Sequence, residues 1–97
     1  MTNHDFVFSS RAADAFRDII RDLQQVSLLS AEKVRSRIMH KLHLIQHQPM
    51  QASKKVELNI DGHFRCATVL NYKIYYKLDE STISVVDIVL DKDAKRL

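Results

Sequence analysis

The stretch Asn71-Tyr72-Lys73-Ile74-Tyr75-Tyr76-Lys77-Leu78 decides the fold, because its apolar and polar residues alternate at a period of two. This period is typical of a strand with one buried face and one face in water. The face that we expect in the core carries Tyr72, Ile74, Tyr76 and Leu78. The opposite face, which we expect to form a basic and aromatic surface, carries Lys73, Tyr75 and Lys77.

Three further segments with strand-like composition flank this stretch, and short polar turns separate them. They are Val56–Ile60, Phe64–Leu70 and Thr82–Leu90. The turn Asp61–His63 holds the only glycine of the chain, the residue best able to take positive φ in a tight hairpin. Asn71 tolerates the left-handed conformation, and the turn before Thr82 is polar and of hairpin length. The four segments together predict an antiparallel meander.

A short strand and two amphipathic helices precede the meander. Phe6 and Phe8 stand at strand spacing, so we expect a first strand over residues 3–8. Ser9 or Ser10 then caps a helix from about Arg11 to Ser27. Its apolar residues recur at separations of three and four, and they are Ala12, Phe16, Ile19, Ile20, Leu23 and Val26.

The second helix is expected to begin at a Ser30 cap, to follow a short connection through Leu28 and Leu29, and to end near His47 before Pro49. Its apolar stripe consists of Ala31, Val34, Ile38, Leu42 and Ile45. Two helices joined this tightly form an antiparallel hairpin whose stripes can cover one face of a sheet. We therefore predict a single α+β domain over residues 1–97, with the hairpin packed on a mainly antiparallel sheet of four to five strands.

The composition indicates one compact folded domain. The 97 residues are 45% hydrophobic, with one Gly and one Pro, which is unlike a disordered chain. A single Cys cannot form an intramolecular disulfide, and neither a signal peptide nor a membrane-spanning run is visible. We therefore expect a cytoplasmic protein that does not contact membranes. The net charge of +3 favours an acidic partner, either nucleic acid or protein.

Three groups of reactive side chains suggest no catalytic or metal centre. His40, His43 and His47 share a helical face opposite the apolar stripe, where solvation is the ordinary role. No His or Asp stands at a spacing that identifies it as a catalytic base for Cys66. We therefore expect Cys66 to act as a small buried hydrophobe. Asp87 lies inside a strand and is expected to pair with a lysine of the neighbouring strand. We expect neither a metal nor a cofactor.

Basic residues gather around the strands and are the candidate functional set. Arg65, Lys73 and Lys77 lie on strands, whereas the flanking members are Lys54, Lys55, Lys92, Lys95 and Arg96. Such groups bind phosphate, and Tyr75 could stack on a base. The same pattern also fits a sheet face that lysines simply keep soluble, and composition alone does not separate the two interpretations.

The order of elements and several short motifs resemble the RelE/ParE toxin superfamily. The motifs are Ser10-Arg11-Ala12, Phe64-Arg65, the stretch from Asn71 to Leu78, and the ending Asp87-Ile88-Val89-Leu90-Asp91-Lys92. The resemblance covers nearly the whole chain. It implies a toxin of a bacterial type II toxin–antitoxin pair, held silent by a cognate antitoxin whose peptide tail wraps the toxin.

The resemblance also implies two classes of target, because one branch cuts mRNA on the ribosome and another poisons DNA gyrase. The RelE branch uses basic residues on a sheet face, and Arg65, Lys73 and Lys92 match such positions. However, Ala67 stands where a second strand lysine is expected, and neither an aromatic residue nor a histidine follows Leu90. We therefore expect a ParE-like toxin that inhibits its target by binding. The alternatives are a ribosome-dependent mRNA endonuclease and a diverged member with neither activity.

Overall fold

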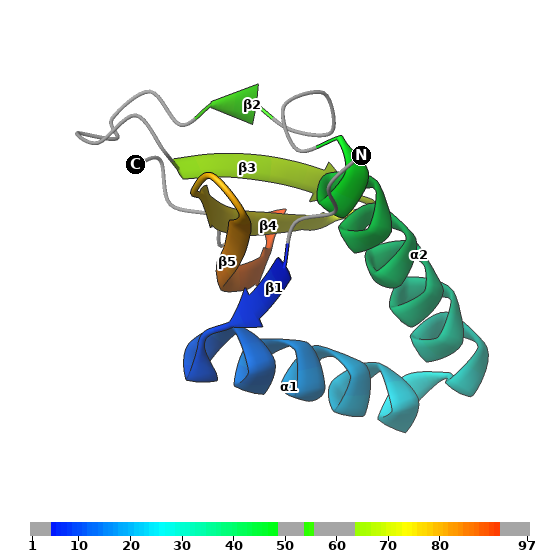
Figure 1. The fold of residues 1–97 in the computed structure, drawn as a ribbon. Helices are drawn as coiled ribbons and strands as arrows, with labels where there is room; N and C mark the ends of the chain where they lie inside the picture. Colours follow the sequence, from blue (N-terminus) through cyan, green and yellow to red (C-terminus); the bar gives the residue numbers. More distant parts are fainter. Residues whose placement is uncertain (1–4, 49–53, 56–63, 92–97) are drawn as a thin grey trace.

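The computed structural model describes residues 5–48, 54–55 and 64–91, and it has the predicted α+β architecture. The helices and strands follow the predicted order (Figure 1). They are β1 (Asp5–Phe8), α1 (Ser10–Val26), α2 (Leu28–His47), β2 (Lys54–Lys55), β3 (Phe64–Val69), β4 (Tyr72–Leu78) and β5 (Thr82–Leu90). The described strands form one sheet in the order β1-β5-β4-β3-β2, whose centre is the predicted antiparallel meander β3-β4-β5.

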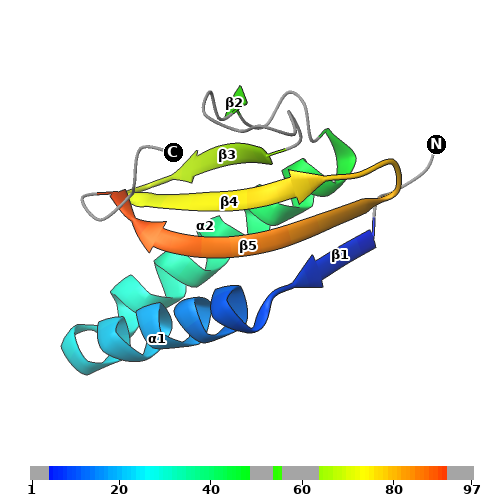
Figure 2. The ribbon, with the colours of Figure 1, turned by 90° about the vertical axis from the view of Figure 1, so that its left-hand side faces the viewer.

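The first strand completes the sheet at the edge next to the last strand. β1 pairs with β5 in parallel, with Phe6 opposite Ile83 and Phe8 opposite Val85. The chain passes through both helices before it returns to the sheet. Because β1 and β5 are parallel whereas β3, β4 and β5 pair antiparallel, the sheet is mixed. Figure 2 shows the strands of the meander with β1 beside β5, α2 behind them and α1 below.

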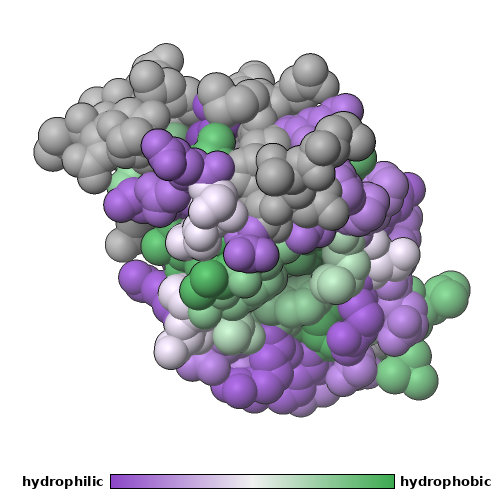
Figure 3. Space-filling model, viewed as in Figure 1, coloured by the Kyte–Doolittle hydropathy of each residue, from purple (hydrophilic) through white to green (hydrophobic). Residues whose placement is uncertain are grey.

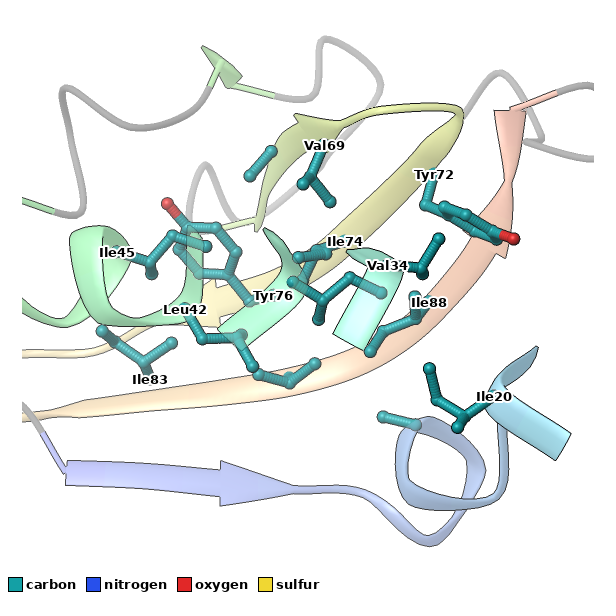
Figure 4. Packing of buried hydrophobic residues seen from close by; sticks show 14 of the residues in the cluster. Ile20, Val34, Leu42, Ile45, Val69, Tyr72, Ile74, Tyr76, Ile83 and Ile88 are labelled. Atoms are coloured by element: carbon teal, nitrogen blue, oxygen red, sulfur yellow. The ribbon is translucent and has the colours of Figure 1, made fainter. Parts of the chain in front are cut away.

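The helices cover one face of the sheet and enclose the core. Ile74 and Tyr76 of β4 are completely buried there, and Tyr72 is 9% exposed, which confirms the predicted facing of this strand. Figure 4 shows these side chains projecting toward Val34, Leu42 and Ile45 of α2. Burial of one such aliphatic or aromatic side chain stabilises the fold by about 1.5–3 kcal/mol. The apolar stripes of both helices therefore perform the predicted role, except for Val26, which was expected in the stripe of α1 but is 85% exposed at the end of that helix.

A β-bulge between β4 and β5 changes which residues of β5 face the core. Tyr76 pairs with Val85, but the preceding Tyr75 pairs with Asp87, so Val86 is the extra residue. Val85 and Ile88 are both buried, although they are three residues apart along the strand. A regular strand would place these two side chains on opposite faces. The bulge therefore keeps Ile88 in the core and turns Asp87 to the opposite face.

Ser9 fixes the start of α1 to this bulge. Its backbone N–H donates to the carbonyl of Val85 at 3.0 Å, and its hydroxyl donates to the carbonyl of Val86 at 2.8 Å. The same hydroxyl accepts a hydrogen bond from the backbone N–H of Ala12 at 2.9 Å, so Ser9, rather than Ser10, is the N-cap of α1. One side chain thus joins the first helix to the last strand.

Two predicted local features are wrong. The second helix is capped by Ser27, whose hydroxyl accepts from the backbone N–H of Ser30, so Leu28 and Leu29 are helical rather than a connection. The residue with positive φ in the β3–β4 turn is Leu70, at 53°, and not Asn71. The left-handed conformation costs a residue with a Cβ about 1–2 kcal/mol, and burial elsewhere in the hairpin compensates for it. The predicted strand Val56–Ile60 and the turn at Gly62 lie outside the described residues.

Candidate functional site

The face of the sheet away from the helices is open and carries the chemically active side chains of β3, β4 and β5. Cross-strand partners share a face, and the register pairs Thr68 with Lys73 and Cys66 with Tyr75. We call this surface the open face; its described residues include Cys66, Thr68, Lys73, Tyr75, Lys77 and Asp87. Figure 2 views the sheet from this side, with α2 behind it.

Lys73 is held in place at one end of the open face. Its Nζ donates to Thr68 Oγ1 at 3.2 Å and lies 3.7 Å from Asp91 Oδ1, just beyond the end of β5. The lysine side chain is 29% exposed, whereas that of Asp91 is 58% exposed. The Asp91 carboxylate therefore offsets the positive charge of Lys73, which the sequence had suggested as a ligand for a phosphate group.

Tyr75 and Cys66 form a hydrogen-bonded pair at the middle of the open face. Burial raises the pKa of the Cys66 thiol, and the nearby Lys73 charge together with the Tyr75 hydrogen bond opposes this rise. Burial also raises the pKa of the Tyr75 phenol, which the neighbouring Cys66 raises further. Both groups therefore keep their protons at neutral pH.

Asp87 adds a second ion pair to the open face. Its Oδ2 lies 3.5 Å from Nε of Arg11 in the first turn of α1, and its Oδ1 accepts from the backbone N–H of Ile88 at 2.9 Å. The partner is thus an arginine of the helix and not the lysine of the neighbouring strand that we expected. The expectation failed because only the packing of α1 against β5 brings Arg11 to this strand.

Lys77 lies at the far end of the open face from Lys73. It stands opposite Phe64, with Nζ 6.0 Å from the centre of the phenyl ring. This distance is at the outer limit of a cation–π contact. Within the described residues no carboxylate forms an ion pair with Lys77, so it is the open-face cation that remains available to a partner.

Arg65 does not share the open face with Lys73, which corrects our expectation of one basic surface. Its register partner is Tyr76, whose side chain is in the core, so Arg65 projects toward the side that the helices cover. Arg65 and Lys73 occupy positions of opposite parity once β3 and β4 are in register. Cys66 is also corrected, because it is half-buried on the open face rather than enclosed in the core.

The remaining members of the basic set are placed only in part. Lys54 and Lys55 form β2, opposite Cys66 and Arg65 respectively. Lys92, Lys95 and Arg96 lie outside the described residues. Sequence reasoning missed Arg11, Thr68 and Asp91 at the site. Thr68 was detectable from its parity with Cys66, but neither Arg11 nor Asp91 stands at a spacing that points to the open face.

The histidines of α2 do not form a metal centre within the described residues. The rings of His43 and His47 pack edge to face with their centres 4.3 Å apart. No group of three or more His, Cys, Asp or Glu side chains in the described part of the chain is arranged to hold a metal ion. Neither described helix combines the length and apolar character that crossing a membrane requires.

Comparison with known proteins identifies the family. Residues 6–94 match the family model described as the ParE toxin of type II toxin–antitoxin system, parDE. The chain belongs to the ParE toxin family. It is therefore the toxin component of a type II toxin–antitoxin system, as its resemblance to the RelE/ParE superfamily implied. No curated protein sequence matches this ParE-family toxin.

Two solved structures share the fold of this ParE-family toxin. One is the chromosomal ParDE toxin–antitoxin system from P. aeruginosa, with 16% identity, a TM-score of 0.70 and coverage of 90% of this chain and 95% of that one. The other is the toxin–antitoxin complex RelBE2 from Mycobacterium tuberculosis, with 12% identity, a TM-score of 0.59 and coverage of 92% and 99% respectively. At these identities the likeness establishes the fold.

The thiol of this ParE-family toxin provides a direct probe of the open face. Because burial raises the pKa of Cys66, alkylation by iodoacetamide should reach half its maximal rate at a higher pH than alkylation of a small free thiol. Lys73 lowers this pKa, so Lys73→Gln should move the midpoint to still higher pH. Lys77→Gln is the matched control and should leave the midpoint unchanged. An alkylation midpoint that stays the same in the Lys73→Gln variant would contradict the placement of Lys73 near Cys66.

Proposed function

We propose that this ParE-family toxin acts in the bacterial cytoplasm by binding and inhibiting DNA gyrase, and that it does not cut RNA. The observation that carries the proposal is the charge balance of the open face. Asp91 lies beside Lys73, and Asp87 pairs with Arg11. A surface that must hold a phosphodiester benefits from an excess of positive charge, and here carboxylates reduce that excess.

The chemistry of the open face also argues against RNA cleavage. In-line attack by a ribose 2′-hydroxyl needs a base, an acid and positive charge at the phosphate. Tyr75 and Cys66 both retain their protons at neutral pH, so neither serves as the base. Ala67, at the position where the superfamily leads us to expect a second lysine, is 1% exposed and faces the core. A lysine there would not lie on the open face, so the residue at this position does not change the charge of that face.

The same face suits contact with a protein. Aromatic residues are enriched at the centres of protein interfaces, and Tyr75 and Phe64 lie on adjacent strands of this face, with Lys77 opposite Phe64. We propose that these residues contact the target, with Lys73 at the rim. We also propose that the flanking basic residues contribute to target binding; they are Lys54, Lys55, Lys92, Lys95 and Arg96.

The experiment compares the two mechanisms on one preparation of folded toxin. We expect inhibition of plasmid supercoiling by DNA gyrase, or trapped cleavage complexes, and no cleavage of mRNA on programmed ribosomes in a single-turnover assay. General acid–base assistance is typically worth about 10²–10⁴-fold in rate, so its absence should be plain. Rapid ribosome-dependent cleavage with gyrase unaffected would instead establish the endonuclease alternative, and inactivity in both assays would indicate a diverged member.

The contact surface is tested by Tyr75→Ala and Lys77→Ala in the gyrase assay. Loss of a central interface residue often costs about 2 kcal/mol or more, which corresponds to a concentration for half-inhibition that rises by roughly 30-fold. Lys33→Ala, an exposed lysine on α2, is the control and should retain full activity. Unchanged inhibition by both folded variants would remove the open face as the target-binding surface.

A further inference from the structure

The end of the helical hairpin carries an exposed apolar patch. Val26 ends α1 and Leu28 and Leu29 begin α2, and these residues are 85%, 71% and 82% exposed. Single exposed apolar residues are normal on a protein surface, but large ones grouped together mark a site of interaction. Figure 3 shows hydrophobic residues that protrude on the right-hand side of the molecule, where α1 and α2 meet in Figure 1. We call Val26, Leu28 and Leu29 the apolar tip.

An apolar groove begins at the same tip. It has a volume of about 540 Å³ and lies between α1 and the end of the sheet where β4 begins and β5 ends. The apolar residues of its helical wall are Ala15, Ile19, Leu23 and Val26, and Tyr72 and Leu90 contribute to the wall formed by the sheet. Among the described residues that line the groove, Asp22 is the only charged one. Val26 therefore belongs both to the groove and to the apolar tip.

We infer that two copies of the toxin associate through this tip and this groove. The two features share Val26, so a two-fold axis near this residue places the apolar tip of each copy in the groove of the other. The dimer then contains two equal contacts, and both copies bury their exposed leucines. Leu28 and Leu29 lie in the first turn of a helix that Ser27 caps, so their backbone is ordered before association and loses little entropy in it.

The charges beside the tip and inside the groove are complementary. Lys33 lies one helical turn after Leu29, on the same side of α2, and within the described residues it forms no ion pair. Asp22 lies 3.7 Å from Nε of Arg21 in an exposed pair, which contributes little energy. When Leu29 of one copy enters the groove of the other, its neighbour Lys33 therefore approaches Asp22 of that groove.

Other occupants fit this surface less well. A nucleic acid would meet a groove whose one charged group among the described residues is the Asp22 carboxylate, which repels phosphate. A different protein would have to present an apolar knob and an apolar pocket in the matching arrangement, and a second copy of the toxin already has both. The contact lies on the helical side of the sheet, so each copy keeps its open face accessible. The inference does not depend on the identity of the target.

Sedimentation equilibrium of the full-length toxin without its antitoxin tests the association. The weight-average mass should rise from the 11.3 kDa of one chain toward twice that value between about 1 and 100 µM, the range of a weak dimer. Leu29→Glu brings a charge into the apolar groove and should raise the dimer Kd by at least about tenfold. Met39→Glu is the matched control, because Met39 is an exposed apolar residue of α2 away from the tip, and it should change the Kd by less than about threefold.

Charge reversal distinguishes this contact from non-specific apolar association. Asp22→Lys and Lys33→Glu should each raise the dimer Kd by about threefold or more, because like charges then meet across the contact. The double variant restores opposite charges and should recover the Kd of the unmodified toxin to within about twofold. Glu80→Lys is the control for a change of charge, because Glu80 is exposed in the β4–β5 turn, at the other end of the strands from the groove. It should leave the Kd unchanged.

The substituted residues are all exposed, so each variant should fold, and a thermal melt verifies this. A folded toxin that stays monomeric at about 100 µM would overturn the inference. Equal effects of Leu29→Glu and Met39→Glu, or a double charge variant that recovers nothing, would also overturn it. The mass is measured without gyrase or ribosomes, so this outcome is separate from that of the proposed function.

Discussion

Replacement of Ile74 by alanine should lower the free energy of unfolding by about 2–5 kcal/mol, the usual cost of a large-to-small change in a packed core. Ile74 is completely buried at the centre of β4, between the sheet neighbours Ala67 and Ile88. The helices pack on it from the covered side, so no nearby side chain is free to fill the cavity. In a domain of this size each 1 kcal/mol corresponds to about 4–8 °C in the melting temperature.

The adjacent Lys73 provides the control for this prediction. Lys73→Ala removes a partly exposed ion pair and one hydrogen bond on the open face, so its effect on stability should stay within about 1 kcal/mol. Both variants are compared by urea unfolding. Similar small losses for the two would mean that the strand faces are assigned incorrectly. A large loss for Lys73→Ala alone would reverse the assignment.

Replacement of Ser9 by alanine should lower the free energy of unfolding by about 2 kcal/mol, which is at the upper end for an N-cap. The hydroxyl accepts from Ala12 in the first turn of α1 and donates to Val86 in the bulge of β5. Alanine therefore leaves a helical N–H and a part-buried carbonyl without this partner, and each such loss has a desolvation cost.

Ser27 is the matched control for Ser9. It caps α2 through one exposed hydrogen bond of 3.2 Å to the backbone N–H of Ser30. Ser27→Ala should therefore cost only about 0.5–1 kcal/mol by thermal or urea unfolding. Ser9→Thr, which retains a hydroxyl, should recover most of the stability lost in Ser9→Ala. Equal losses for Ser9→Ala and Ser27→Ala would show that the contact with the bulge does not contribute.

Sequence periodicity predicted the architecture because burial imposes a period on each element. The period-two stretch from Asn71 to Leu78 identified the buried face of β4, and spacings of three and four identified the helical stripes that cover it. Family motifs then predicted the toxin class, which the family match confirms. Local chemistry was less decisive. Four serines stand near the helix starts, and a propensity for capping does not tell which of them meets a free N–H.

The tertiary structure alone decided the site, because its charges meet across elements that are far apart in the chain. Ser9 donates a hydrogen bond to Val86, and Arg11 forms an ion pair with Asp87. Both contacts depend on the β-bulge, which the apolar pattern of β5 does not predict. The register of β3 against β4 moved Arg65 away from Lys73 and placed Cys66 beside Tyr75. The sequence by itself determined the buried faces of β4 and α2 and the positions of the charged residues along the chain. Only packing determined which charges face one another, since register and helix placement are set by the sum of many long-range contacts.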